Sequence, residues 1–356
     1  MKSNKILMTG NEAIAEAALQ TGCRFYAGYP ITPQNEIPAY MSRRMPEVGG
    51  VFVQAESELA AINMIFGASL TGRRAMTTSS SPGVSLKQEG ISYLAGCQLP
   101  AVIVNIMRGG PGLGNISPSQ SDYFQATKGG GHGDYRCIVL APSTVQEAVD
   151  VTVLAFDLAD KYRGPVLILG DGLLGQMMEP IRAFKTQSTK RKPAKKSWAL
   201  TGARGRKPKI IRSLLLKEGA LEAFNNLLKT RYRRIESREQ RFEAVQTADS
   251  KVVLVAYGSV ARIAREAMMM ARAQGMKVGL IRPVSLWPFP DKAFSTLLTR
   301  NSKLQNILVV EMSTGQMVED VRLAVSGKCP VRFFGRTGGG IPTAEEILKK
   351  IKAAYK

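Results

Sequence analysis

Hydrophobic residues fall into short runs that alternate with helical patterns along the first half of the chain. Several runs contain the β-branched and apolar residues that are typical of buried strands. The stretch 57–70 is rich in Ala and Gly and predicts a tightly packed helix, and Asn11 is the N-cap that we expect for an earlier helix. This alternation favours a parallel sheet that is covered by helices. The expected strands lie at 24–28, 51–54, 75–79, 101–107, 138–141 and 166–170.

The alternating pattern is interrupted between about 179 and 250 and then returns. The interrupted segment begins with basic residues, Pro and Gly, and continues as a charged helix that we expect over 218–245. A chain of 356 residues is also too long for one ordinary core. We therefore predict a parallel-sheet domain at 1–180, a basic linker and charged helix at 181–250, and a smaller α/β domain at 251–356. The strands expected in the last part lie at 252–257, 278–282, 307–311 and 331–335.

Lysine and arginine outnumber aspartate and glutamate by 49 to 28, which gives a net charge of +21. The excess is concentrated, because the segment 181–217 contains no acidic residue. A lysine-rich segment with Ser, Pro and Gly is more often a solvated connector than a binding site. Nucleic-acid binding is the alternative that the charge leaves open, although no motif of stacking aromatic residues accompanies the segment.

The chain shows none of the patterns expected of a membrane or secreted protein. No apolar run approaches the ~20 residues of a membrane span, and the start of the sequence has no signal-peptide core, so we expect a cytoplasmic protein. The four cysteines (Cys23, Cys97, Cys137 and Cys329) form no CxxC pair, and His132 is the single histidine. Iron–sulfur and structural zinc sites need clustered ligands, so a partner would have to carry any metal redox chemistry.

Several polar residues follow directly after predicted strands, where parallel α/β sheets bind their ligands. Two prolines in the loop 29–34 hold Thr32 in an extended segment, where its hydroxyl can face a ligand. Glu58 lies at a predicted helix start, where a carboxylate also suits the helix dipole. A simple capping role explains Glu56 as well as it explains Glu58.

Arg108 comes directly after an apolar strand and before a glycine-rich loop. A guanidinium in this position is well placed to hold a carboxylate in a bidentate fork, and an ordinary surface arginine at a strand exit is the alternative. Gly170-Asp171-Gly172 resembles the start of the magnesium–diphosphate signature of thiamine enzymes. The asparagine of that signature is missing from the expected window, so we interpret Asp171 as part of a strand-end turn. His132 is expected in a loop and not as a catalyst.

Taken together, residues 29–34, residues 57–61 and Arg108 resemble the alpha subunits of the 2-oxoacid:ferredoxin oxidoreductases in order and spacing. The resemblance extends along nearly the whole chain. The loop 112–118 is similar to that of the 2-oxoisovalerate branch, and the 2-oxoglutarate branch is the close alternative. The family implies a thiamine-diphosphate-binding, pyrimidine-type parallel-sheet domain followed by a transketolase C-terminal-like α/β domain. The match also includes 132–134, 139–142, 170–172, 176–180, 282–283, 286–290, 310–312 and 336–339.

The same resemblance implies roles for particular residues. Glu58 would hydrogen-bond N1′ of the cofactor's aminopyrimidine, with Glu56 as the alternative, and Tyr29 and Pro30 would contact the cofactor. Thr32 and Arg108 would bind the substrate, Arg108 through its carboxylate. A non-catalytic structural subunit is the remaining alternative, and the presence of Thr32, Glu58 and Arg108 together argues against it.

The family further implies a division of labour between subunits. A beta subunit would carry the diphosphate, the magnesium ion and an iron–sulfur cluster, and gamma and small ferredoxin-like subunits would complete the complex. The reaction would be the oxidative decarboxylation of a branched-chain 2-oxoacid to its acyl-CoA. Coenzyme A would accept the acyl group and ferredoxin the electrons. No specific nucleic-acid partner and no membrane partner are expected.

Overall fold

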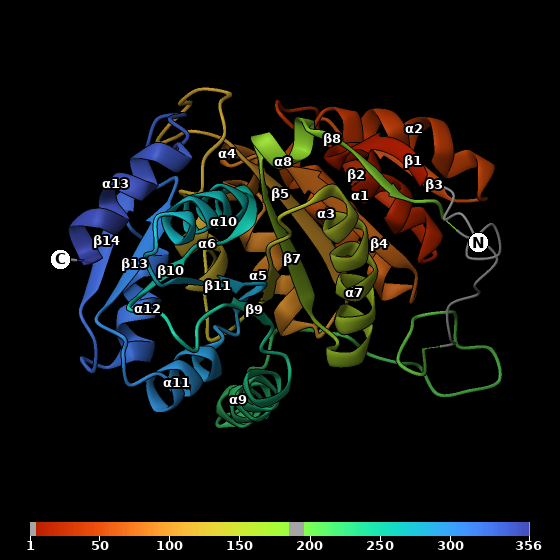
Figure 1. Cartoon of the computed structure of the whole chain (residues 1–356). Coiled ribbons are helices and arrows are strands. Elements are labelled where there is room, and N and C mark those ends of the chain that lie inside the picture. The colour runs from red at the N-terminus through yellow and green to blue at the C-terminus, as the bar shows by residue number, and fades with distance from the viewer. Residues whose placement is uncertain (1–4, 185–195, 356) are drawn as a thin grey trace.

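A seven-stranded sheet forms the centre of the first part of the chain, in the order β12-β6-β7-β5-β4-β2-β3. The computed structural model describes residues 5–184 and 196–355 (Figure 1). Strands β2 to β7 run parallel, and β5 and β7 are buried along their whole length, which explains their continuous apolar runs. The strands are β2 (Cys23–Gly28), β3 (Val51–Gln54), β4 (Arg74–Ser79), β5 (Ala101–Met107), β6 (Ile138–Leu140), β7 (Pro165–Asp171) and β12 (Ser285–Trp287).

Two groups of helices pack around this sheet. Helix α1 contacts α2 and α7, and α3 contacts α5; Figure 1 shows α7 beside β7, which it contacts. Helices α3 and α5 approach closely because Gly90 has no side chain, and a Cβ there would clash with Ile62. The helices are α1 (Gly10–Gln20), α2 (Glu36–Glu47), α3 (Glu58–Leu70), α4 (Pro82–Ser85), α5 (Gln88–Gly96), α6 (Tyr123–Thr127), α7 (Val145–Tyr162) and α8 (Gly172–Gln176).

Side chains cap the N-termini of both α3 and α1, and the cap of α1 differs from the expected one. Ser57 caps α3 as its Oγ accepts a hydrogen bond from the Ala60 N–H at 3.1 Å. The expectation that Asn11 caps the first helix was wrong, because Thr9 is the N-cap and forms a capping box with Glu12. Asn11 is instead buried and donates a hydrogen bond to the Pro33 carbonyl at 2.9 Å, a contact between distant segments that no local pattern reveals.

A second, five-stranded sheet has the order β14-β13-β10-β11-β9. The helix expected over 218–245 ends earlier, as α9 (Ala220–Arg238), and Phe242–Val245 forms strand β9, antiparallel to β11. The other elements are β10 (Val252–Val255), β11 (Val278–Pro283), β13 (Asn306–Glu311) and β14 (Val331–Gly335), with α10 (Gly258–Ala273), α11 (Asp291–Arg300), α12 (Met317–Val325) and α13 (Ala344–Tyr355).

The two large sheets exchange strands across the predicted segment limits. Strand β9 belongs to the second sheet although it lies in the segment 181–250, and β12 pairs with β6 of the first sheet although it lies in 251–356. The three-part division therefore stays a prediction. A third, two-stranded sheet pairs β1 (Lys5–Thr9) with β8 (Met178–Arg182) in antiparallel fashion.

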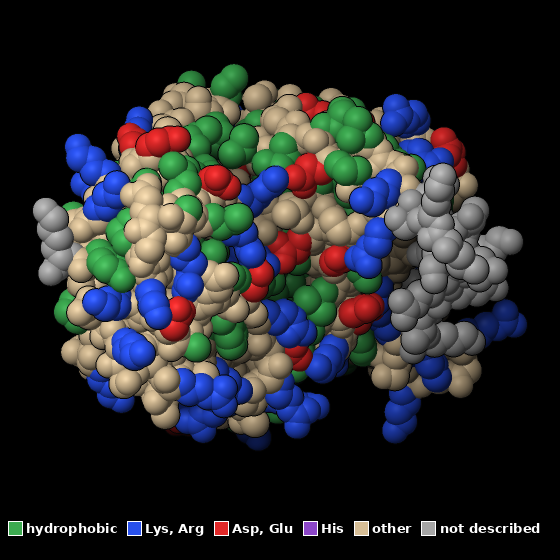
Figure 2. Space-filling view, viewed as in Figure 1, with side chains coloured by type: hydrophobic (Ala, Val, Ile, Leu, Met, Phe, Trp, Pro, Cys, Tyr) green, Lys and Arg blue, Asp and Glu red, His purple; other side chains and the backbone are tan. Residues whose placement is uncertain are grey.

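Basic side chains are distributed over the surface. Figure 2 shows lysine and arginine spread over the visible face, with acidic side chains between them. Part of the basic segment 181–217, including Lys185, Lys190 and Lys192, lies outside the described residues, as do residues 1–4 of the N-terminal segment. Within the two described ranges, none of the helices combines the length and the apolar character that a membrane crossing requires.

Candidate functional site

The carboxyl ends of β2, β3, β4 and β5 meet at one edge of the seven-stranded sheet. The loop after β2 carries Thr32, the helix after β3 begins with Glu58, and β5 is followed by Arg108. The Arg108 guanidinium donates a hydrogen bond from Nη1 to the Thr32 carbonyl at 2.9 Å. The fold thus brings together residues that lie 76 positions apart in the sequence.

Glu58 is buried, with 6% of its surface exposed, and no described residue donates a hydrogen bond to its carboxylate. The backbone of α4 lies directly against it, because a Cβ at Gly83 would clash with Glu58 Oε1 and with Ser79 Oγ. Glu56 is exposed, so the two glutamates that the sequence left equivalent have different environments. A buried carboxylate without a partner is costly, so this one is free to accept a hydrogen bond from a donor outside the described chain.

Arg108 is also buried, with 7% exposed, and lacks a counter-ion. Its Nη2 donates to the Leu113 carbonyl at 3.3 Å, and its Nε has no hydrogen-bond partner. No carboxylate of the described residues lies within ion-pair distance of it. The two carbonyl contacts fix the guanidinium plane, and the uncompensated charge and the free N–H suit an anionic ligand such as a carboxylate.

The loop after β2 forms the side of the site next to Arg108. Thr32 is half-buried, and its Oγ1 accepts a hydrogen bond from Asn35 Nδ2 at 3.3 Å. Tyr29 and Pro30, at the start of this loop, are exposed. Gln34 Nε2 donates to the Tyr29 carbonyl at 3.3 Å and so helps to hold the loop in place.

Sequence reasoning missed a polar segment that follows β4. The hydroxyls of Ser79 and Ser80 are buried without a hydrogen-bond partner among the described residues. The run Ser79-Ser80-Ser81-Pro82-Gly83, which begins at the last residue of a predicted strand, is a signal that could have found them. Nearby, the Asp122 carboxylate accepts hydrogen bonds from Ser81 Oγ at 2.6 Å and from Asn105 Nδ2 at 2.9 Å. Burial raises the pKa of Asp122, and these two hydrogen bonds partly oppose the rise.

Lys87 is a second residue that sequence reasoning missed. Its side chain is fully buried, and Nζ donates to Thr77 Oγ1 at 2.6 Å and to the Thr78 carbonyl at 3.0 Å. Burial lowers the pKa of Lys87 to about 7, and the charge of Glu58 partly opposes this change. No local pattern indicates this burial, because a lysine before a helix is ordinarily exposed.

Asp171 and His132 have structural surroundings. Asp171 ends β7 and caps α8 by accepting a hydrogen bond from the Leu174 N–H at 3.0 Å, which agrees with the strand-end turn that we expected. Its other oxygen accepts from Ser259 Oγ at 2.6 Å. Burial raises the pKa of Asp171 above its ordinary value, and its hydrogen bonds only partly oppose this rise. His132 is exposed, and its ring packs edge-on against Tyr93 with centroids 5.9 Å apart.

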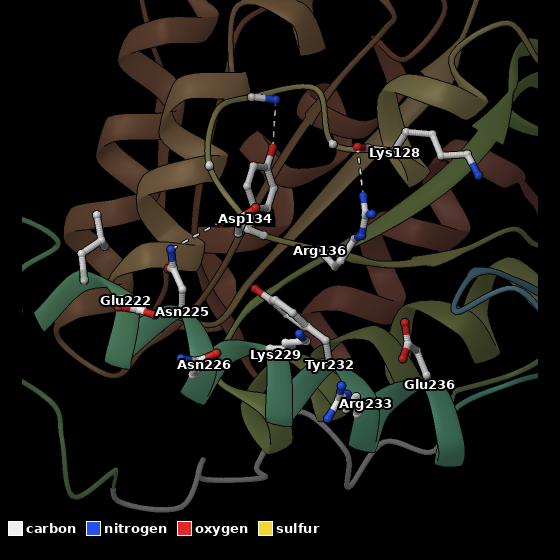
Figure 3. Close-up of a pocket in the computed structure, with 15 residues that line it drawn as sticks. Lys128, Asp134, Arg136, Glu222, Asn225, Asn226, Lys229, Tyr232, Arg233 and Glu236 are labelled. Atoms are coloured by element: carbon white, nitrogen blue, oxygen red, sulfur yellow. Dashed lines mark hydrogen bonds between the residues drawn. The ribbon is translucent and has the colours of Figure 1, made fainter. Parts of the chain in front are cut away.

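A separate cavity of about 950 Å³ lies between α9 and the loop after α6. Figure 3 shows side chains of both signs around it, with Asn225 of α9 oriented toward Asp134 of the loop. None of Thr32, Glu58 or Arg108 lines this cavity. It is therefore distinct from the candidate site at the strand ends.

The residues at the strand ends fit the aminopyrimidine half of thiamine diphosphate and a carboxylate substrate. The unpartnered Glu58 carboxylate and the unpartnered hydroxyls of Ser79 and Ser80 match a flat ring that carries hydrogen-bond donors and acceptors. The glycine at position 83 leaves room beside the carboxylate that a side chain would fill. The described part of this chain offers no group of three His, Cys, Asp or Glu side chains that could hold a metal ion.

Comparisons with known proteins agree with this geometry. Residues 16–251 match the family described as pyruvate flavodoxin/ferredoxin oxidoreductase, thiamine-diphosphate-binding, and residues 250–347 match pyruvate:ferredoxin oxidoreductase core domain II. The chain is 51% identical to the ketoisovalerate oxidoreductase subunit VorB of Methanothermobacter thermautotrophicus, over 97% of each chain. It is 37% identical to the 2-oxoglutarate synthase subunit KorA of the same organism, over 98% of each chain.

A solved structure shows the same fold. The 2-oxoglutarate:ferredoxin oxidoreductase of Magnetococcus marinus, with 2-oxoglutarate, coenzyme A and succinyl-CoA bound, superposes with a TM-score of 0.87 at 28% identity. The match covers 99% of this chain and 66% of that one. The expected fold, a thiamine-diphosphate-binding α/β domain followed by a second α/β domain, is confirmed. The chain belongs to the alpha-type subunits of the 2-oxoacid:ferredoxin oxidoreductases, the family whose thiamine-diphosphate-binding region covers residues 16–251 here.

Proposed function

We propose that the chain is the pyrimidine-binding subunit of a branched-chain 2-oxoacid:ferredoxin oxidoreductase. The complex would convert 3-methyl-2-oxobutanoate, coenzyme A and oxidised ferredoxin into the acyl-CoA, carbon dioxide and reduced ferredoxin. One observation carries the proposal: Glu58 and Arg108 lie at the same edge of the sheet, and both are buried. Among the described residues, Glu58 has no hydrogen-bond donor and Arg108 has no counter-ion. The higher identity to the ketoisovalerate subunit (51%) than to the 2-oxoglutarate subunit (37%) supports the branched-chain substrate.

Thiamine diphosphate, when bound, supplies a carbon nucleophile for the 2-oxo group and accepts the electrons that decarboxylation releases. Glu58 would hold a proton at N1′ of the aminopyrimidine, and its burial at the start of α3 keeps water from competing for that hydrogen bond. Ser79 and Ser80 would orient the ring through their unpartnered hydroxyls. Tyr29 and Pro30, exposed at the start of the loop after β2, would close over it.

Arg108 would hold the carboxylate of the 2-oxoacid, and Thr32 would lie beside the substrate. The hydrogen bonds from Arg108 to the Thr32 and Leu113 carbonyls hold the guanidinium in place before the substrate arrives. These two hydrogen bonds also use N–H groups of the guanidinium. Fewer donors then remain for the substrate carboxylate, which would be bound less tightly in the ground state. This suits a reaction in which the carboxylate is the group that leaves.

A partner subunit would complete the site. Large apolar side chains next to the site residues are exposed: Leu59 follows Glu58, Leu86 precedes Lys87, and Leu113 lies in the loop after Arg108. Exposed apolar groups around a site are typical of a surface that another chain covers. We propose a beta subunit that holds the diphosphate, magnesium and an iron–sulfur cluster, with gamma and small ferredoxin-like subunits beside it.

The test is anaerobic, coenzyme-A-dependent reduction of a viologen dye by the chain purified with its co-expressed partner subunits. We expect 3-methyl-2-oxobutanoate to give a higher kcat/KM than 2-oxoglutarate or pyruvate. Preference for 2-oxoglutarate would overturn the substrate and keep the enzyme class. Absence of reduction with all three acids, in a complex that contains thiamine diphosphate and iron, would overturn the catalytic proposal.

A further inference from the structure

Ser81 has a backbone conformation that a residue with a side chain rarely adopts. It precedes α4 with a φ of 26° and a ψ of −84°, and its side chain does not cap that helix. Such a conformation persists only where surrounding contacts hold it. The two residues before it, Ser79 and Ser80, carry the unpartnered buried hydroxyls. Gly83, two residues after it, lies directly against the Glu58 carboxylate. The backbone at Ser81 therefore sets where these groups lie.

Three residues hold Ser81 in this conformation. Its N–H donates a hydrogen bond to Asn105 Oδ1 at 3.0 Å, and its Oγ accepts one from the Arg108 N–H at 3.0 Å. The same Oγ donates to Asp122 Oδ2 at 2.6 Å. Asn105 belongs to β5, and the pairing of β5 with β4 places it opposite Ser79. Two neighbouring strands thus supply partners to the turn between β4 and α4.

Asp122 completes this network from a third segment. It precedes α6, but its carboxylate does not cap that helix. The oxygen that accepts from Ser81 also accepts from Asn105 Nδ2 at 2.9 Å. A carboxylate only accepts hydrogen bonds, so it fixes which atoms of its two neighbours remain for other partners. The Asn105 amide oxygen is left for the Ser81 N–H, and the Ser81 hydroxyl oxygen is left for the Arg108 N–H.

The network connects the two halves of the candidate site. The segment after β4 carries the hydroxyls and the glycine next to Glu58, and the segment after β5 carries Arg108. The ladder between β4 and β5 ends at Ser79 and Asn105. Beyond that pair, the distance between the two segments depends on contacts such as the hydrogen bond between Ser81 Oγ and the Arg108 N–H.

We propose that Asp122 is a positioning residue that acts through Ser81 and sets the distance between Arg108 and the ring-binding groups after β4. The proposal rests on the function given above. The 2-oxo carbon has to lie next to the reactive carbon of the cofactor while the substrate carboxylate contacts Arg108. A misplacement of about 1 Å between reacting groups costs on the order of 10²-fold in rate. In this role Asp122 needs no contact with either ligand.

The experiment uses the co-expressed complex and three measurements. Viologen reduction gives kcat and KM for 3-methyl-2-oxobutanoate. Calorimetry of the cofactor-free complex gives the Kd of thiamine diphosphate. Hydrogen–deuterium exchange of the cofactor-free complex follows the peptides that contain the Ser81 and Arg108 amides, whose N–H groups donate within the network.

Asp122→Ala should lower kcat by about 10–100-fold, because the two halves of the site lose their fixed distance. KM and the Kd of thiamine diphosphate should change by less than about threefold, because the binding groups themselves remain. The Ser81 and Arg108 amides should exchange about tenfold faster. Asp122→Asn should restore most of kcat and the slow exchange, because its amide oxygen can accept both hydrogen bonds.

Two substitutions of Ser81 test the conformation itself and serve if Asp122→Ala does not fold. Neither Ser81→Ala nor Ser81→Gly has a hydroxyl, but glycine lacks the Cβ that makes a positive φ costly. Ser81→Ala should therefore lower kcat at least about fivefold more than Ser81→Gly. Equal losses would mean that the hydroxyl acts directly on a ligand, and the positioning role would be wrong.

Glu239 provides the matched control. It is a buried carboxylate that accepts side-chain hydrogen bonds from Lys161, Tyr162 and Arg241. Because Tyr162 precedes β7, this cluster lies at the opposite edge of the sheet from the candidate site. Glu239→Ala should lower the melting temperature and leave kcat and KM of the folded complex unchanged.

The outcomes separate positioning from the other roles of Asp122. If Asp122→Ala lowers only the melting temperature, as the control does, the residue is merely structural and the proposal fails. If it raises KM and leaves kcat unchanged, Asp122 contributes to binding and the proposal also fails. Absence of viologen reduction by the wild-type complex would overturn the function on which the proposal rests. The exchange of the two amides would still decide whether Asp122 holds them in place.

Discussion

The two large sheets each place a buried glutamate near a helix N-terminus, and the two glutamates have opposite surroundings. Glu311, at the end of β13, accepts hydrogen bonds from the backbone N–H groups of Gln316, Met317 and Val318 and from the Ser313 hydroxyl. Glu58, at the start of α3, accepts none from the described residues. Burial alone therefore does not mark a site, whereas burial without partners does.

Two arginines repeat the contrast. Arg282 is 8% exposed and Arg108 is 7% exposed. Arg282 donates to both oxygens of Glu147, at 2.8 and 2.9 Å, and to Glu243 at 3.0 Å, so it joins the second sheet to α7. Arg108 contacts two carbonyls and no carboxylate. Arg282 and Glu311 thus have the partners of structural residues, whereas Arg108 and Glu58 are left without charged partners among the described residues.

The largest expected difference is between the two glutamates. Glu58→Gln should lower turnover of the assembled complex by about 10²–10⁴-fold, the range of a lost acid–base group, with little change in melting temperature. Glu311→Gln should instead lower stability by about 1–3 kcal/mol, because it disturbs a satisfied buried carboxylate. Viologen reduction and thermal melting of both variants check this. Near-wild-type turnover by Glu58→Gln would contradict the comparison.

The arginines should differ in the same direction with a smaller effect. Arg108→Met should lower kcat/KM by roughly 10–100-fold, equivalent to a charge-assisted hydrogen bond of about 1.5–3 kcal/mol, and leave stability unchanged or higher. Arg282→Met should cost about 1–3 kcal/mol of stability, because Glu147 loses its arginine partner but remains partly solvated and Glu243 keeps only Arg265. Steady-state kinetics and urea unfolding distinguish the two. A loss of stability in Arg108→Met as large as in Arg282→Met would refute the contrast.

Lys87 should give the stability of the chain a recognisable pH dependence. Its pKa is about 7 when folded and about 10.4 when unfolded, so the unfolded chain binds more protons between these values. Above about pH 10.4 the lysine is neutral in both states and does not lower the free energy of unfolding. As the pH falls from there to about 7, the free energy of unfolding decreases by up to ~1.4 kcal/mol per pH unit.

Urea unfolding of the full chain at pH 7 and pH 8 measures this slope. Lys87→Met should remove it, and Lys229→Met, on the exposed side of α9, should retain it. Burial raises the pKa of the Cys23 and Cys137 thiols, which acts in the opposite direction, but this effect is common to all three proteins and cancels in the comparison. If the free energy of unfolding changes with pH equally in Lys87→Met and in the wild type, burial does not lower the pKa of Lys87.

The smallest effect concerns the apolar surface next to the site. Leu113 and Leu323 are both strongly exposed, the first in the loop after Arg108 and the second on α12. Leu113→Ser should weaken assembly with the partner subunit by about 1 kcal/mol, a factor of roughly five, and Leu323→Ser should not. Sedimentation of the mixed subunits measures this, and equal losses in both variants would remove Leu113 from the interface.

Local sequence patterns predicted most elements and the residue types of the site. Continuous apolar runs predicted the buried strands, the small residues of 57–70 predicted helix α3, and the order of Thr32, Glu58 and Arg108 indicated the family. These features depend on neighbours in the sequence, through strand periodicity, helix capping and motif spacing. The roles of Tyr29, Pro30, Thr32, Glu58 and Arg108 stay predictions.

The tertiary structure decided which polar groups have partners. Asn11 donates a hydrogen bond to the Pro33 carbonyl, and Thr9 is the N-cap of α1. Strands β9 and β12 pair with sheets that their position in the chain does not indicate. Lys87 and Glu58 are both buried, and helices α3 and α5 pack closely at Gly90. Burial and hydrogen-bond satisfaction are sums over contacts from distant segments, so local patterns cannot encode them. For the same reason the sequence could not distinguish the two glutamates, of which the fold buries Glu58 and exposes Glu56.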